Sequence, residues 1–319
     1  MTLAIETIDL THRYKKLIAL DRLNLQVEHG CIYGFIGPNG AGKTTTLRII
    51  AGLLQPTKGE VRLLGERLTT RTAQRLVGYM PDFFGVYDDL RVWEYLDFFA
   101  RCYGLRGSRL RQVVNELLDL VDLSEKRHAF VQTLSRGMQQ RLCLAHALVH
   151  DPPILLLDEP ASGLDPRARV ELRELLRTLR EMGKTIMLSS HILSELAEVC
   201  DAIGIIDHGR MVLSGPLAEV QHQLATGSRA RIRIARTDDV GLAMTLLQRQ
   251  SLVRTVSAAP ADSRSLTVEF NEPLSEIQCA VLLAELIGAG VAVSEFSARS
   301  ENLEELFLRL TTRAAETRV

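Results

Sequence analysis

The feature that most constrains this chain is the segment Gly-Pro-Asn-Gly-Ala-Gly-Lys-Thr-Thr at residues 37–45. The apolar run 31–36 before it predicts a strand, and the residues after it predict a helix over 43–53. A glycine-rich loop in this setting is typical of a phosphate site, because its backbone N–H groups can surround phosphate oxygens and the helix N-terminus adds partial positive charge. The segment predicts an α/β fold with a nucleotide site at the carboxyl edge of a sheet.

The residues of this loop have separate expected roles. Lys43 is expected to reach the β- and γ-phosphates of the nucleotide, and the Thr44 hydroxyl is expected to bind Mg²⁺. The residues expected to hold the nucleotide are Gly37, Pro38, Asn39, Gly40, Ala41, Gly42, Lys43, Thr44 and Thr45.

Two carboxylates, Asp158 and Glu159, close the aliphatic run Ile154–Leu157. A strand this apolar is buried, so its charged end is expected at the carboxyl edge of the sheet, where ligands bind in open α/β folds. Asp158 is expected to hold Mg²⁺ through water, and Glu159 to polarise the attacking water. Without the phosphate-binding loop, two exposed carboxylates at the start of a loop would explain the pattern equally well.

The segment Leu-Ser-Arg-Gly-Met-Gln at 134–139 resembles the signature motif of ATP-binding cassette (ABC) proteins, usually written LSGGQ. Ser135 and Gly137 match the motif, whereas Arg136 and Met138 depart from its commonest form. The resemblance implies that Ser135 and Gly137 contact the γ-phosphate bound by the opposite subunit, and a serine hydroxyl, a glycine N–H and a helix N-terminus all favour an anion. A helix N-cap at Ser135 is the alternative reading of the segment alone.

Further positions extend the resemblance to about residues 3–225. Tyr14 lies where the family places an aromatic ring that stacks on adenine. Segment 161–165 resembles the D-loop, which links the two sites of a dimer, and His191 resembles the switch histidine that contacts the γ-phosphate. The resemblance implies ATP and Mg²⁺ as cofactors and ATP hydrolysis between two copies, with Glu159, His191 and Lys43 as catalytic residues.

One position departs from the family in a way that bears on the chemistry. After Tyr-Met-Pro at 79–81 the family usually has a glutamine that touches Mg²⁺ and the attacking water, and this chain has Asp82. The shorter, charged side chain either ligates Mg²⁺ more directly or is displaced from the site. The aromatic segment 83–87 that follows is either a docking surface for a membrane subunit or a local packing cluster.

The expected fold class is α/β: a P-loop nucleotide-binding domain with a helical subdomain, plus a small C-terminal α+β ferredoxin-like domain. The expected boundaries are 1–226 for the first domain, about 84–150 for its helical subdomain, and 228–319 for the second domain. The order β-α-β-β-α-β in the second domain is the basis for the ferredoxin-like assignment.

The alternation of strands and helices in the first domain predicts a largely parallel sheet covered on both faces. In that domain, strands are predicted at 4–10, 23–27, 31–36, 60–64, 76–80, 154–158, 185–189, 202–207 and 211–214, and helices at 43–53, 110–121, 166–182 and 192–200. In the second domain, strands are predicted at 230–234, 253–257, 266–270 and 291–296, and helices at 240–250, at 274–287 and after Ser300.

Composition limits the partners. The formal net charge of −1 gives no electrostatic case for nucleic acid. No run of about 18 apolar residues is present, so no membrane span is expected and the pore of a transporter would be a separate chain. The N-terminus predicts no signal peptide.

The five cysteines are widely spaced, which favours buried free thiols in a reducing cytosol.

The function expected is that of the ATP-binding and ATP-hydrolysing subunit of an ABC transporter of the ABC-2, export type. The partners expected are an integral-membrane permease subunit and a second cassette, as a homodimer or a related ATPase subunit, at the cytoplasmic face of the cell membrane. The alternative is a soluble ABC-type ATPase that acts on ribosomes or DNA. The single set of motifs and the short segment 46–133 without sustained heptads disfavour it.

The role of the C-terminal domain stays open between a small-molecule sensor and a structural or dimer-stabilising appendage. Its arginines at 229, 231, 233 and 236 form a stripe that faces either anionic lipid headgroups or solvent.

Overall fold

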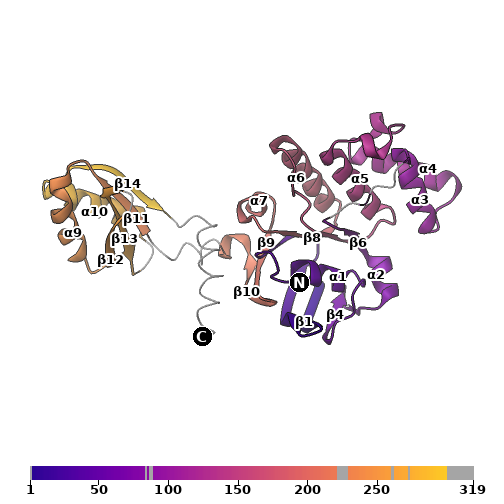
Figure 1. The fold of residues 1–319 in the computed structure, drawn as a ribbon, viewed down its shortest axis with the longest axis horizontal. Helices are drawn as coiled ribbons and strands as arrows, with labels where there is room; N and C mark the ends of the chain where they lie inside the picture. Colours follow the sequence, from indigo (N-terminus) through magenta and orange to yellow (C-terminus); the bar gives the residue numbers. More distant parts are fainter. Residues whose placement is uncertain are drawn as a thin grey trace. The chain divides into compact units, whose positions relative to one another are not determined.

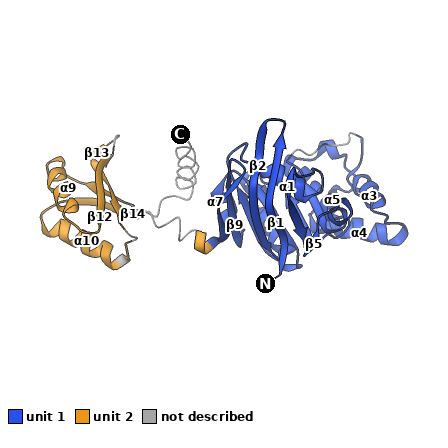
Figure 2. Ribbon diagram, turned by 90° about the horizontal axis from the view of Figure 1, so that it is seen from below, with its two compact units in different colours: residues 1–217 blue, residues 218–319 orange. Residues whose placement is uncertain are grey.

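The computed structural model describes residues 2–82, 85, 89–220, 229–259, 262–271 and 274–299 (Figure 1). The chain divides into two compact units, Met1–Leu217 and Ala218–Val319 (Figure 2). Residues 221–228, which include the boundary expected from the sequence, lie outside the described residues.

The first unit is built on a six-stranded sheet of order β10-β9-β3-β8-β7-β6. Neighbouring strands from β9 to β6 run parallel, and β10 is an antiparallel edge strand. All residues of β3, β7 and β8 are buried, as the apolar runs predict. The strands are β3 Ile32–Ile36, β6 Val77–Met80, β7 Ile154–Leu157, β8 Thr185–Ser190, β9 Ala202–Asp207 and β10 Arg210–Pro216.

A second, antiparallel sheet of order β2-β1-β4-β5 corrects the expectation of one largely parallel sheet. β1 Leu3–Tyr14 and β2 Leu17–Glu28 form a long hairpin. Only Lys15 and Lys16 join them, and so short a connection permits only antiparallel pairing. The remaining strands are β4 Lys58–Leu63 and β5 Glu66–Arg67.

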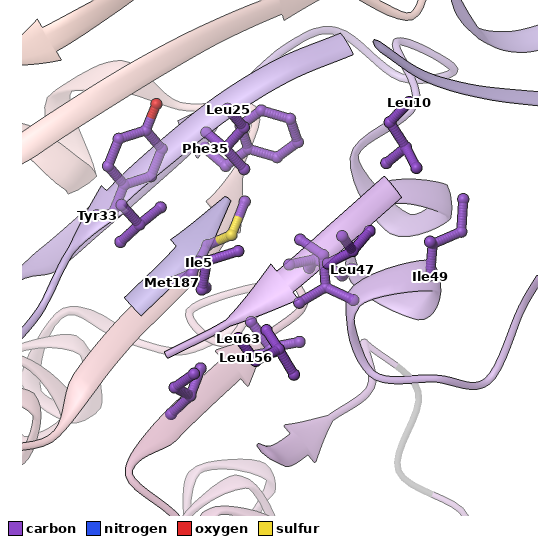
Figure 3. Close-up of a cluster of buried hydrophobic side chains, with 14 of the residues drawn as sticks. Ile5, Leu10, Leu25, Tyr33, Phe35, Leu47, Ile49, Leu63, Leu156 and Met187 are labelled. Carbon is purple, nitrogen blue, oxygen red and sulfur yellow. The ribbon is translucent and has the colours of Figure 1, made fainter. Parts of the chain in front are cut away.

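One buried apolar cluster holds the two sheets and the helix after the phosphate-binding loop together (Figure 3). Leu25 comes from the antiparallel sheet, Leu47 from helix α1, and Phe35, Leu156 and Met187 from the parallel sheet. Figure 1 shows α6 and α7 on the opposite side of the parallel sheet from α1. The core therefore fixes the helix that begins the nucleotide site against the strands that carry the carboxylates.

The helices of the first unit follow the expected positions with three differences. Helix α1 ends at Ile50 rather than near 53, and α7 is only five residues long. Helix α2 was not expected, although Thr69 caps it by accepting from the Thr72 N–H. The helices are α1 Lys43–Ile50, α2 Thr70–Leu76, α3 Val92–Cys102, α4 Gly107–Leu120, α5 Arg136–Leu148, α6 Pro166–Glu181 and α7 Leu193–Ala197.

Helices α3, α4 and α5 pack on one another beside the parallel sheet (Figure 1). Helix α4 covers the helix predicted at 110–121 and buries Leu110, Val114, Leu117 and Leu118 along one face. This helical group lies in sequence between β6 and β7, so it joins the carboxyl end of β6 to the amino end of β7.

The second unit confirms the β-α-β-β-α-β order. Its four strands form an antiparallel sheet of order β12-β13-β11-β14, which is the ferredoxin-like arrangement. The helix expected after Ser300 lies outside the described residues. The elements are β11 Arg229–Ile234, α9 Val240–Gln248, β12 Val253–Ala259, β13 Asp262–Phe270, α10 Glu276–Gly288 and β14 Val293–Arg299.

None of the helices in the described ranges is both long and apolar enough to cross a bilayer. The five cysteines, all within the described residues, form no disulfide bond. Cys143 and Cys200 are buried, and burial raises the pKa of the Cys143 thiol to about 12. Cys102 is exposed, so the expectation of buried thiols is wrong at that position.

Replacement of Leu156 by alanine is expected to lower the melting temperature of the chain by about 5–15 °C, because a cavity in this core costs about 2–5 kcal/mol. Leu156 is fully buried, whereas Leu53 is 65% exposed and provides the matched control. Leu53→Ala is expected to leave the transition unchanged. Calorimetry of the full chain measures both, and equal shifts would contradict the assignment of Leu156 to the central core.

Candidate functional site

The loop between β3 and α1 is shaped by glycines that accept no side chain. Gly40 and Gly42 have φ angles of +82° and +112°, a region that L-residues rarely adopt. A Cβ on Gly42 would lie 2.8 Å from the carbonyl oxygen of Ala19, and a Cβ on Gly37 would collide with the carbonyl oxygen of Ile206. The loop backbone therefore lies directly against the neighbouring strands at Gly37 and Gly42, a close approach that suits a phosphate cradle built of backbone N–H groups.

Lys43 lies within this loop and is 6% exposed. Its ammonium donates to the carbonyl oxygens of Gly37 at 2.6 Å and Pro38 at 3.3 Å. It also lies 3.4 Å from Oε1 of Glu159. The charge of Lys43 is thus held among oxygen acceptors at the mouth of the loop, the place where phosphate oxygens would compete for it.

The two carboxylates after β7 have different environments. Asp158 is 1% exposed, and its Oδ1 accepts a hydrogen bond of 2.7 Å from Ser189 Oγ. The Glu159 N–H donates to the same Ser189 oxygen at 2.9 Å. One hydroxyl at the end of β8 therefore orients both acidic residues at the end of β7.

Ser189 is a site residue that the sequence reasoning missed. Its signal was the change from the apolar residues of β8 to two serines before His191. A polar side chain at the carboxyl end of a buried strand needs a hydrogen-bond partner, and here the partners are the neighbouring acidic residues.

Glu159 has a left-handed backbone, with φ +49°. Its carboxylate lies between Lys43 and His191, with Oε2 2.9 Å from His191 Nδ1. Non-glycine residues in this region store strain and cluster at functional sites. The structure thus brings together Lys43, Glu159 and His191, which the sequence placed in three separate motifs.

Asp82 lies at the same edge. It follows β6, whose last residue Met80 pairs with Leu157 and accepts a hydrogen bond from the Asp158 N–H. Loss of hydration raises the pKa of the Asp82 carboxyl, and the charges of Asp158 and Glu159 raise it further, while Arg136 and His191 oppose them. The Asp82 carboxyl is therefore within reach of the charges of these acidic and basic residues.

The remaining expected residues lie around this cluster. Thr44 and Thr45 are half-buried in the first turn of α1, whereas Asn39 is exposed. Tyr14 ends β1 with 43% of its surface exposed and meets His12 edge-on at 4.6 Å. The exposed part of the ring leaves an apolar surface on which a base can stack.

The expected Mg²⁺ ligands are hard oxygen donors at this edge: the Thr44 hydroxyl and the carboxylates of Asp158 and Asp82. Mg²⁺ in nucleotide sites takes one or two carboxylates and completes its shell with phosphates and water. This donor set fits that pattern.

The signature segment forms a separate part of the site. Ser135 caps α5 by accepting from the Met138 N–H at 3.4 Å, and Gly137 packs close to Ala168 of α6. The segment lines a cleft of about 360 Å³ together with Gly163 and Asp165. Its hydroxyl, N–H groups and helix terminus thus lie beside segment 161–165, the D-loop of the resemblance.

The comparisons agree with this geometry. Residues 20–162 match the family model for ABC transporters. The daunorubicin/doxorubicin resistance ATP-binding protein DrrA of Streptomyces peucetius is 34% identical over 99% of this chain and 95% of its own length. The Nod factor export ATP-binding protein I of Cupriavidus metallidurans is 35% identical over 98% of this chain and 99% of its own length.

Solved structures resemble the first unit. An ATP-binding subunit of an ABC transporter has a TM-score of 0.62 and 32% identity, covering 69% of this chain and 92% of that structure. The dimeric cassette MJ0796 with ADP and Pi has a TM-score of 0.61 and 27% identity, and the match covers 67% of this chain and 98% of that structure. The chain belongs to the ABC transporter family. Within that family it is an ATP-binding and ATP-hydrolysing subunit, so the expected fold class and activity are confirmed.

Replacement of Ser189 by alanine is expected to slow ATP hydrolysis about 10- to 100-fold, because Asp158 and Glu159 lose their common hydrogen-bond partner. The buried groups left unpaired also lower stability by about 1–3 kcal/mol. The control is Ser265→Ala, which removes another buried serine, bonded to Asp262 in the second unit. Equal hydrolysis rates for the two variants would show that Ser189 does not orient the acidic residues.

Proposed function

We propose that this chain powers an export permease by closing over MgATP as a pair of cassettes and hydrolysing it. The observation that carries the proposal is the Glu159 carboxylate, held by a strained backbone between the Lys43 ammonium and the His191 ring. A half-buried base flanked by a cation and a histidine at the mouth of a phosphate cradle suits activation of water against a terminal phosphate.

In this proposal the glycine-rich loop binds the phosphates and Tyr14 stacks on the adenine. Thr44, Asp158 and Asp82 hold Mg²⁺, which when bound neutralises charge on the phosphate oxygens. Glu159 accepts a proton from the attacking water, and His191 and Lys43 stabilise negative charge at the terminal phosphate. Ser189 keeps Asp158 and Glu159 in their separate orientations.

A second cassette completes each site. Ser135 and Gly137 lie at the start of α5 beside segment 161–165, and their donors suit an anion supplied by another subunit. The dimeric state of the MJ0796 cassette supports this arrangement. The partner cassette is a second copy of this chain or a related ATPase subunit.

The membrane partner is an integral-membrane permease, with the cassettes at the cytoplasmic face of the cell membrane. The direction of transport is proposed as export, because two relatives that cover nearly the whole chain are named for drug resistance and Nod factor export. The alternative, a soluble ATPase acting on ribosomes or DNA, lacks support from these relatives.

The role of Glu159 has a direct test. Glu159→Gln keeps the size and hydrogen bonding of the side chain but removes the base, so turnover is expected to fall at least about 100-fold while ATP binding persists. Hydrolysis is measured by phosphate release, and binding by equilibrium titration with MgATP. Hydrolysis at the normal rate would show that another group activates the water.

The partner is tested by affinity purification of Glu159→Gln from detergent-solubilised membranes in the presence of MgATP, which traps the closed pair. Recovery of a stoichiometric integral-membrane protein is the expected result. The control is Lys43→Ala, whose pair of cassettes is expected not to close. The proportion of the membrane protein recovered with it is therefore expected to differ from that recovered with Glu159→Gln. Recovery of ribosomes or DNA without a membrane protein would overturn the transporter proposal in favour of the soluble alternative.

A further inference from the structure

Helix α6 carries a row of arginines on the face that meets the segment after His191. They recur every three or four residues, the spacing of one helix face, and they are Arg169, Arg173, Arg177 and Arg180. They contact, in that order, the carboxylates of Glu195 and Glu198, the Glu198 carbonyl and the carboxylate of Asp201. Both α6 and α7 lie on the same side of the parallel sheet (Figure 1). The row therefore attaches the segment that follows His191 to α6.

Arg169, the first arginine of this row, has a second contact. Its Nη1 lies 2.7 Å from Glu195 Oε1 on α7, and its Nε donates to the Leu164 carbonyl at 3.1 Å. Leu164 belongs to segment 161–165, which follows Glu159 after one residue. A guanidinium presents several N–H groups in a rigid fork, so it can hold two acceptors at once. One side chain thus joins segment 161–165 to α7.

These contacts close a circuit around the proposed base. The Ser162 N–H donates to the Glu159 carbonyl at 3.0 Å, which ties the backbone of the base to the segment that Arg169 holds. Oε2 of Glu159 lies 2.9 Å from His191 Nδ1, and Glu195 follows His191 by four residues. Glu159 is therefore reached by two routes, through its backbone and through its carboxylate, and Arg169 connects them.

Apolar packing gives α7 little support of its own. The helix has five residues and buries Leu193 and Leu196, and an isolated helix of that length is not stable in water. A cavity of about 40 Å³ lies between α6, α7 and the segment after Glu159, so side chains do not fill the space inside the circuit. The Glu195 side chain is 19% exposed, so its ion pair with Arg169 is partly shielded from salt. This ion pair is thus a main constraint on α7 and on His191 before it.

We propose that Arg169 is a positioning residue for ATP hydrolysis, which sets the position of His191 relative to Glu159 through Glu195 and the Leu164 carbonyl. The inference rests on the roles of Glu159 and His191 in the proposed function. Arg169 contacts none of the reacting atoms in this mechanism. Its effect is geometric, because a displacement of about 1 Å at a reacting centre can cost about 100-fold in rate.

The test is a double-mutant cycle of Arg169→Met and Glu195→Gln in the full chain, with kcat of ATP hydrolysis measured at saturating MgATP. Each single substitution is expected to lower kcat about 5- to 20-fold. The double variant is expected to match Arg169→Met within about twofold, because both substitutions break the same ion pair.

Nucleotide binding separates positioning from a loss of folded protein. The dissociation constant of MgADP and the number of sites per chain are expected to stay within about twofold of the unmodified chain, because Lys43 and the glycine-rich loop lie outside the circuit. A variant that merely unfolds in part would lose sites in proportion to its loss of activity.

Arg180→Met is the matched control. Arg180 lies on the same face of α6, and its side chain is 38% exposed, against 39% for Arg169. Its partner Asp201 also accepts from the Ile32 N–H at 2.8 Å, so Asp201 stays in place without the arginine. Arg180→Met is expected to shift the melting temperature about as much as Arg169→Met and to leave kcat within about twofold.

Three results would overturn this inference: kcat at the normal level in Arg169→Met, an equal loss of kcat in Arg180→Met, or losses that multiply in the double variant. Each of them leaves the proposed function intact as long as Glu159→Gln is inactive. Hydrolysis at the normal rate by Glu159→Gln would instead overturn the proposed function, whatever the Arg169 variants do.

Discussion

The hydrogen bonds of Ser189 are the interaction on which the site depends. One hydroxyl donates to Asp158 and accepts from the backbone of Glu159, so two adjacent acidic residues take different directions. Asp158 is directed into the protein, whereas Glu159 adopts φ +49° and reaches Lys43 and His191. Ser189 thus fixes the Asp158 carboxylate directly and Glu159 through its backbone N–H, while Lys43 and His191 hold the Glu159 carboxylate. The hydroxyl itself is fixed because β8 is buried along its whole length.

The parallel sheet explains why residues from four distant segments meet. β3, β6, β7 and β8 all end at one edge, and the loop at 37–43, Asp82, Asp158 and His191 follow those ends. The apolar cluster that includes Leu47, Leu156 and Met187 fixes α1 against the same strands. The distance between Lys43 and Glu159 is therefore set by the packing of the core, and the polar contacts adjust it.

Much of this architecture could be predicted from the sequence, because the phosphate-binding loop and the run 154–159 carry strong local patterns. The separate antiparallel sheet could not, since strand periodicity does not state which strand is the neighbour, and the short Lys15-Lys16 connection was overlooked. Ser189 was also missed, because a serine shows its role only when its hydrogen-bond partners are known. The contact between Arg136 and Gly163 joins residues of two motifs and has no signature in either one.

Three features at the site violate local preference: the left-handed backbone of Glu159, the cation at the start of α5, and Asp82 among other carboxylates. Such violations persist where the surroundings stabilise them and the arrangement serves function. Ser189 provides that stabilisation for Glu159, and the contact with Gly163 provides it for Arg136. Because only Pro160 separates segment 161–165 from Glu159, a movement of α5 also acts on the backbone that carries the proposed base. The attachment of α5 to this segment is thus physically linked to the residue proposed to activate water.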